Sequence, residues 1–140
     1  MKEQFVPYEI ALKLKELGFY EECLAFYLWQ SWNDSERLEI GDDSEYKVET
    51  LSAPLWQQTF DWFRIKHLLH SSIDFSGIKE KDDNDVEYFY YQINEQWSLG
   101  KDFYDYSYGF KHVKYESHFT TYKEARLACL EKLIEIIQNK

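Results

Sequence analysis

Glycine and proline are scarce in this chain of 140 residues, which contains five glycines and two prolines. Such a composition excludes a low-complexity linker between separate parts. Hydrophobic residues make up 44% of the chain and aromatic residues 19%, which is too apolar for an intrinsically disordered protein. A chain of this length can bury a substantial core, so we expect a single domain spanning residues 1–140.

Cysteine is equally scarce, with only Cys23 and Cys129, and both lie among apolar residues. A disulfide between them is weakly indicated, and two reduced core thiols in a cytosolic protein are the better interpretation. No apolar run approaches the ~20 residues that span a bilayer. The first ten residues, MKEQFVPYEI, contain no apolar signal segment. We therefore expect a cytoplasmic protein that does not bind membranes.

Basic residues are few, with 16 Lys and Arg against 26 Asp and Glu, so the formal net charge is −10. Phosphate binding depends mainly on Lys and Arg, so direct binding to DNA, RNA or an anionic membrane is not expected. Solubility is the simplest reason for the negative charge. The acidic segments 42–45 and 82–87 leave a second interpretation open, in which the protein imitates nucleic acid and blocks a DNA-binding protein.

Motifs for catalysis and metal binding are missing, since the chain has no G-x-S-x-G, no Gly-rich phosphate loop and no H-E-x-x-H. His67 and His70 would share a helix face if their helix extends that far, but zinc usually needs four ligands. The acidic run 82–85 lacks the Gly and Glu of a calcium-binding EF-hand loop and predicts a hairpin tip. We predict no catalytic residue, metal or cofactor, with a motif-free enzyme as the remaining alternative.

Apolar periodicity predicts three helices. In the first, VPYEIALKLKELGF, Pro7 suits the first turn, and Gly18 predicts a helix end with Leu14 in contact with Phe19. The second, SAPLWQQTFDWFRIKHLLH (residues 52–70), has one wide apolar face. Its aromatic residues are predicted to be core residues instead of a ligand wall: Trp56, Phe60 and Phe63. The third, residues 121–140, begins with the capping-box spacing of Thr121 and Glu124.

Several segments read as strands. CLAFYLW (residues 23–29) is almost continuously apolar, which is typical of a strand at a sheet centre or covered on both faces. A turn at Asn33 and Asp34 precedes a short strand at residues 37–40. Residues 71–97 predict a hairpin with its connection at residues 80–85. A further strand lies in residues 102–110, and residues 112–119 continue it or form another. The fold class is therefore α+β, with an antiparallel sheet of about four to five strands and three helices packed mainly on one face.

Tyrosine is concentrated in the predicted strands of the second half of the chain. In VEYFYYQI, Tyr88 and Tyr90 alternate with the apolar residues expected to face the core, and in DFYDYSYGF three tyrosines share a face. Tyrosine combines an apolar ring with a polar hydroxyl, which suits interfaces and stacking. The candidate binding residues are Tyr88, Tyr90, Tyr104, Tyr106 and Tyr108. The alternative is that tyrosine is used only as a strand residue that tolerates solvent.

Three stretches, FVPYEIALKLKELGF, APLWQQTFDWFRIKHLLHS and TYKEARLACLEKLIEIIQNK, resemble a family of short uncharacterised phage and prophage proteins from gut bacteria. Together they cover about half of the chain. The resemblance implies a phage-related origin and a setting in the cytoplasm of the host cell. It implies no activity, ligand or catalytic residue.

These observations leave three hypotheses for the function. The first, which we favour, is a non-catalytic accessory protein that binds another protein through a tyrosine-rich sheet surface. The second is a protein that binds or sequesters a small ligand such as a nucleotide, with aromatic side chains stacking on the base. The third is the acidic mimic of nucleic acid. The partner is thus an unknown protein or a small ligand, and a homo-oligomer is left open.

Overall fold

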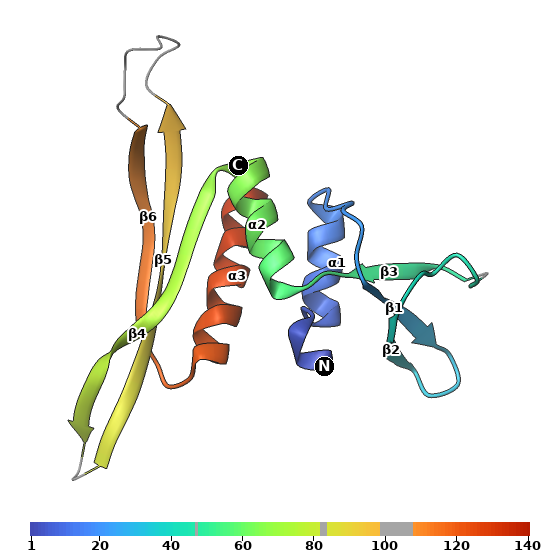
Figure 1. Ribbon diagram of the computed structural model, residues 1–140, viewed down its shortest axis with the longest axis horizontal. Coiled ribbons are helices and arrows are strands. Elements are labelled where there is room, and N and C mark those ends of the chain that lie inside the picture. The colour runs from blue at the N-terminus through green and yellow to red at the C-terminus, as the bar shows by residue number, and fades with distance from the viewer. Residues whose placement is uncertain (47, 82–83, 99–107) are drawn as a thin grey trace. The chain divides into compact units, whose positions relative to one another are not determined.

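The computed structural model describes residues 1–46, 48–81, 84–98 and 108–140 (Figure 1). Contacts divide the chain into two compact units, Met1–Trp62 and Phe63–Lys140, which we describe separately. The predicted α+β class is confirmed. The single sheet of four to five strands is wrong, because the described strands form two antiparallel sheets of three. That the chain forms one domain stays a prediction.

The first unit opens with the short helix η1 (Lys2–Gln4) and helix α1 (Tyr8–Glu16). Pro7 is the N-cap of α1, so the helix begins one residue later than its sequence suggested. The end of α1 is as predicted. Gly18 has a φ of 95°, and the N–H of Phe19 donates to the carbonyl of Leu14 at 2.9 Å. This 6→1 bond in a left-handed glycine turn is the Schellman motif, which satisfies a carbonyl that the helix leaves open.

The sheet of the first unit has the strand order β2-β1-β3 and is antiparallel throughout. Its strands are β1 (Ala25–Gln30), β2 (Ser35–Ile40) and β3 (Thr50–Ala53). The first four residues of β1 are buried, which confirms a central strand. Tyr27 of β1 donates its hydroxyl to the carbonyl of Val6 at 2.7 Å and packs edge-on against Tyr8. β1 is paired on both sides, with β2 and β3 as the edges of this sheet, and the later strands form a separate sheet.

Strand β3 was not expected, since its residues were assigned to a loop and to the start of the second helix. Ala53 precedes Pro54, and a residue before proline disfavours the helical conformation. In β3 the side chains of Leu51 and Ala53 are buried and that of Ser52 is exposed. The alternation of four residues was too short to be recognised as a strand in the sequence.

Helix α2 (Trp56–His67) therefore begins at Trp56 and crosses the boundary between the two units. Trp56 and Phe63 are buried, as predicted, whereas Phe60 is only half-buried. Leu68 has a φ of 56° and ends the helix. His70 consequently lies in a strand, and the helix face that His67 and His70 were expected to share does not form.

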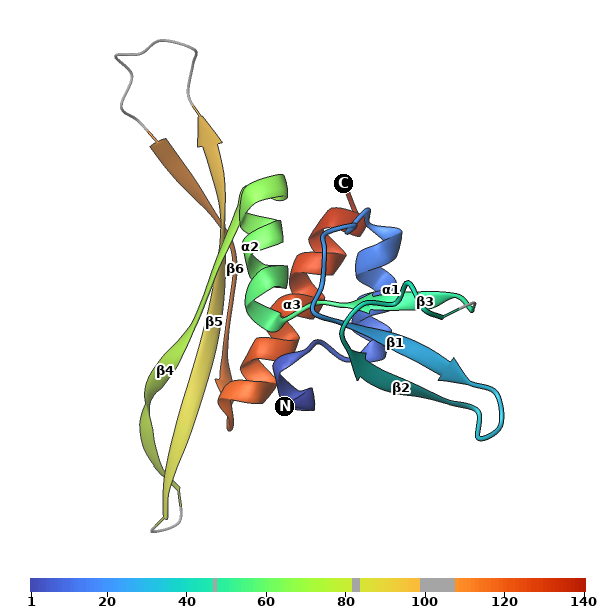
Figure 2. The same ribbon diagram turned by 45° about the vertical axis from the view of Figure 1, so that its right-hand side comes forward.

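The second unit contains three long strands and helix α3 (Figures 1 and 2). Its strands are β4 (Leu69–Lys81), β5 (Asn84–Ser98) and β6 (Tyr108–Phe119), in the order β4-β5-β6. The predicted hairpin is β4 and β5, and residues 112–119 continue the strand that begins at Tyr108. Helix α3 (Tyr122–Gln138) lies along one face of this sheet, and Thr121 accepts the N–H of Glu124 at its start as predicted.

The core of the second unit lies between this sheet and α3. Leu69, Tyr91 and Ile93 are almost fully buried on the sheet side. The helix contributes the following buried residues: Ala125, Cys129, Leu130, Leu133 and Ile134. Among the helices of the described residues, none is long and apolar enough to cross a membrane.

Candidate functional site

The face of the second sheet opposite α3 is the candidate functional site, and we call it the outer face. Tyr91 and Ile93 point into the core, so the even-numbered residues of β5 point the other way. The register adds the residues of β4 and β6 that lie opposite them. The described side chains of the outer face are His70, Ser72, Asp74, Val86, Tyr88, Tyr90, Gln92, Asn94, Gln96, His112, Tyr115 and His118.

Two aromatic pairs join β5 to β6 on the outer face. The rings of Tyr90 and Tyr115 are 5.4 Å apart between centroids and tilted by 33°. The rings of Tyr88 and His118 are 5.7 Å apart and meet edge to face at 82°. Tyr115 is 50% exposed and Tyr88 and Tyr90 are half-buried, so ring surface remains open to a partner. Cross-strand pairs of this kind hold side chains in fixed positions at low entropic cost to binding.

Polar groups continue the outer face toward the N-terminal end of β4. The imidazole Nε2 of His70 lies 2.8 Å from Oε1 of Gln96. Asn94 is paired with His70 on one side and with His112 on the other, so one row crosses all three strands. Three of the four histidines of the chain therefore lie on the same face of one sheet as the tyrosine pairs.

The described side chains of the outer face are almost all uncharged. Among its described side chains only Asp74 is charged at pH 7 when histidine is counted as neutral, although 30% of the whole chain is charged. Charged residues of the same strands, such as Glu95 and Glu116, lie on the opposite side. Interface centres are depleted of charge and enriched in tyrosine, and amide and hydroxyl groups add adaptable hydrogen bonds. In this respect the described side chains of the outer face resemble the centre of an interface more than an ordinary solvated surface.

A bulge in β6 shapes this face. Tyr91 is paired with Glu116 and Phe89 with Phe119, so β6 has an extra residue in this interval. His118 lies in the resulting bulge with a φ of 77°. Bulges re-aim side chains, and here the ring of His118 meets that of Tyr88. Neither His118 nor Tyr115 was predicted as a site residue, because the bulge breaks the alternation on which sequence reasoning depends.

The five predicted tyrosines have different outcomes. Tyr88 and Tyr90 lie on the outer face, as the alternation indicated. Tyr104 and Tyr106 fall within residues 99–107, outside the described residues. Tyr108 is the first residue of β6 and is paired with Ser98, but its side chain is also outside the described part. The cross-strand tyrosine patch therefore consists of Tyr90 and Tyr115 instead of the predicted partners.

Tyr91 belongs to the core and not to this site. Its hydroxyl donates to Oε2 of Glu116 at 2.7 Å, and its ring lies 5.8 Å from that of Phe119. Burial raises the pKa of Tyr91. The carboxylate of Glu116 raises this pKa further, because it accepts a hydrogen bond from the protonated hydroxyl group. Tyr91 therefore stays neutral and anchors β6 against β5 beneath the outer face.

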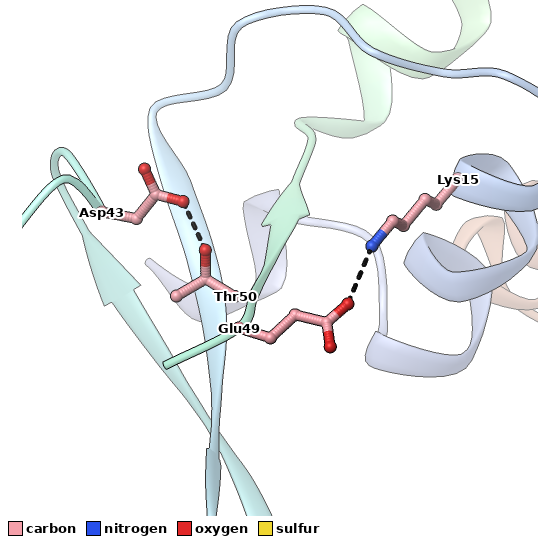
Figure 3. A network of polar contacts seen from close by, with 4 residues as sticks. All are labelled: Lys15, Asp43, Glu49 and Thr50. Atoms are coloured by element: carbon pink, nitrogen blue, oxygen red, sulfur yellow. Dashed lines mark hydrogen bonds and ion pairs between the residues drawn. The ribbon is translucent and has the colours of Figure 1, made fainter. Parts of the chain in front are cut away.

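A second feature is an open pocket of 580 Å³ in the first unit. It is lined by residues 20–26, 41–43 and 52, and four of these are carboxylates: Glu21, Glu22, Asp42 and Asp43. None of the described lining residues is basic. Figure 3 shows Asp43 bonded to Thr50 and, close by, Lys15 of α1 paired with Glu49 at 3.4 Å. All charged side chains among these lining residues are acidic and would repel a nucleotide phosphate, so this lining disfavours nucleotide binding.

The two thiols and the possible metal ligands bear on catalysis and metal binding. Both cysteines are free thiols, and Cys23 is half-buried instead of lying in the predicted core. Burial raises the pKa of Cys23 to about 11 and that of Cys129 to about 12, so neither is a thiolate at neutral pH. In the described part of the chain, no three His, Cys, Asp or Glu side chains gather to hold a metal ion.

Comparisons with known proteins add no relative. No protein-family model matches the chain, and neither a curated protein nor a solved structure is significantly similar to it. The resemblance to phage proteins therefore stays a prediction.

Proposed function

We propose that this protein is a non-catalytic interaction protein that binds a partner protein through the outer face of the β4-β5-β6 sheet. The observation that supports the proposal is that, among the described side chains of this half-exposed face, only Asp74 carries a formal charge, although the net charge of the protein is −10. A sheet face turned only toward water is ordinarily polar and charged, whereas this one presents tyrosine, histidine, asparagine and glutamine.

The partner that suits this face is a protein with its own uncharged, partly apolar patch. Residues 88–96 of β5 span roughly 26 Å at ~3.3 Å per residue, which is the scale of a modest interface. Tyr90 and Tyr115 are the expected anchors, because paired, rigid aromatic rings lose little conformational freedom on binding. We propose further that the partner is a host or phage protein in the cytoplasm, which is the setting that the resemblance to phage proteins implies.

The test compares a double variant, Tyr90→Lys with Tyr115→Lys, with a control, Trp32→Lys. Trp32 is 80% exposed, lies in the other unit and does not line the acidic pocket, so its replacement adds a charge without touching either candidate surface. Proteins captured by the native chain are identified, purified and titrated against each variant. We expect the double variant to lose at least ~10-fold in affinity and the control to lose little. A folded double variant that binds the same partner as tightly as the native chain would refute the proposal.

A second candidate function is the acidic mimic of nucleic acid, which the pocket of the first unit favours. Four carboxylates surround one depression there, and the predicted acidic segment 42–45 contributes two of them. Binding through such a surface should weaken steeply between ~50 and ~500 mM salt and on the change of Glu22→Gln with Asp42→Asn. Salt-independent binding to a DNA-binding partner would exclude it. Nucleotide binding has less support, and a thermal shift with nucleotides tests it directly.

A further inference from the structure

The two edges of the β4-β5-β6 sheet differ in how well they are protected. An edge strand presents main-chain donors and acceptors to any other strand, and proteins protect such edges with charges and bulges. β6 carries Lys111, Lys114 and Glu116 and has two register shifts against β5. In β4 the single register shift and the charged residues Lys79, Glu80 and Lys81 all follow Phe75. Residues 69–75 contain one charged residue, Asp74, and no proline, so this stretch of the β4 edge is the least protected part of the two described edges.

A stretch of β4 also has the regularity that strand pairing needs. From Leu69 to Phe75 the register with β5 is unbroken, and the single shift follows between Phe75 and Gly77. Ser72 and Asp74 are exposed along this stretch, and the side chain of Phe75 is 46% exposed. The seven residues have their centre at Ser72.

We propose that a second copy of this chain pairs with the β4 edge in an antiparallel manner, about a two-fold axis at Ser72. When residues 69–75 of one copy pair antiparallel with residues 69–75 of the second copy, Ser72 lies opposite Ser72 of the second copy. Asp74 then lies opposite His70 of the second copy. The hydroxyls of the two serines can bond each other, and the carboxylate of Asp74 can accept from an imidazole N–H. By symmetry the second contact occurs twice, and an axis at Asp74 would instead oppose two carboxylates.

The geometry keeps the two sheets continuous. Residues that lie directly opposite in an antiparallel pair share a face, so an axis on a residue leaves both outer faces on the same side. The dimer would have a six-stranded sheet with β4 of each copy at its centre. The proposal does not rest on the proposed function, since it concerns the edge of the sheet and not its outer face.

The test uses the symmetry of the proposed contact. Ser72→Lys and Ser72→Asp each place two like charges opposite each other across the axis, and each should weaken association at least ~10-fold in sedimentation at micromolar to millimolar concentration. An equimolar mixture of the two variants should restore association as a heterodimer, because a lysine of one copy then faces an aspartate of the other. Ser117→Lys, on the β6 edge, is the matched control and should associate like the native chain.

The contrary outcomes are equally specific. A native chain that is monomeric up to millimolar concentration would overturn the proposal. Association that survives both single variants, or is lost in Ser117→Lys instead, would also overturn it. If Ser72→Lys alone strengthens association, the introduced lysine faces Asp74 of the second copy, and the axis at Ser72 is refuted. Circular dichroism of each variant shows that the fold is retained, which the exposure of Ser72 leads us to expect.

Discussion

Tyr90 and Tyr115, on adjacent strands, stack with their ring centroids 5.4 Å apart on the sheet face that α3 does not cover. Directly behind them, Tyr91 turns the opposite way and bonds Glu116 on the core side of the sheet. Neighbouring tyrosines of one strand therefore have different positions, Tyr91 in the core and Tyr90 on the proposed binding surface. The alternation of a β-strand is sufficient to separate them, because successive side chains point to opposite faces.

This division of roles predicts opposite effects for two similar substitutions. Tyr91→Phe removes the hydrogen bond to Glu116 and should lower the free energy of unfolding by about 1.5–3 kcal/mol, the range for a hydrogen bond to a charged group. Tyr90→Phe keeps the ring contact with Tyr115 and should change stability by less than ~0.5 kcal/mol. Urea denaturation measures both. An equal loss in the two variants would contradict the assignment of Tyr91 to the core.

The buried face of α2 gives a second prediction. Phe63 is fully buried and Phe60 only half-buried, although the helical period alone treats them as equivalent. Phe63→Ala should therefore cost about 3–5 kcal/mol of stability, and Phe60→Ala less than half of that. The variant Phe63→Leu keeps most of the volume and should still fold if the alanine variant does not. Equal losses at both positions, measured by denaturant unfolding, would show that Phe60 is a core residue after all.

These residues also show which features of the fold and of the candidate site can be predicted from the sequence. Local signals were dependable: the glycine turn after α1, the cap of α3 and the apolar run of β1 each depend on a few neighbouring residues. Strand β3 and the division into two sheets were missed, because which strands pair is decided by contacts distant in the sequence. On the outer face, Tyr88 and Tyr90 follow from alternation. Tyr115 and His118 do not, since a bulge in β6 resets the alternation.

Gly18 provides a test of one such local signal. Its φ of 95° is strained for any residue with a Cβ, and a Cβ built there meets no atom within 4 Å. Gly18→Ala should therefore cost about 1–2 kcal/mol through the backbone alone. Gly18→Asn should cost less, because asparagine tolerates the left-handed region. If thermal unfolding shows no loss for the alanine variant, the Schellman turn does not contribute to stability as described.

The two thiols should differ in reactivity although the pKa of each is raised by a similar amount. The pKa of Cys23 is raised to about 11 and that of Cys129 to about 12, in both cases mainly by burial. At pH 8 each is almost entirely protonated, so both should react slowly with a disulfide reagent. Cys23 is half-buried and should react within the native state, whereas Cys129 should require unfolding. The single variants Cys23→Ser and Cys129→Ser assign the two rates, and a fast Cys129 in native protein would contradict its burial.

His67 should make the second unit sensitive to acid. Burial, and to a smaller extent the nearby Lys140, lowers the pKa of His67 below its ordinary value of ~6.5, and its ring packs 5.9 Å from that of Phe63. Protonation then favours the unfolded chain, whose histidine has the higher pKa. The stabilising contribution is complete above pH ~6.5 and is lost as the pH falls toward the lowered folded-state pKa.

The variant His67→Gln isolates this effect, since the other titrating groups are shared with the native chain. As the pH falls from about 7.5 to 5, the melting temperature of the native protein should fall more than that of this variant. His118→Gln is the control, because His118 is exposed on β6. A native-to-variant difference that is constant over this range would show that His67 titrates alike in the folded and unfolded chains. In that case the ring would not be desolvated at the end of α2.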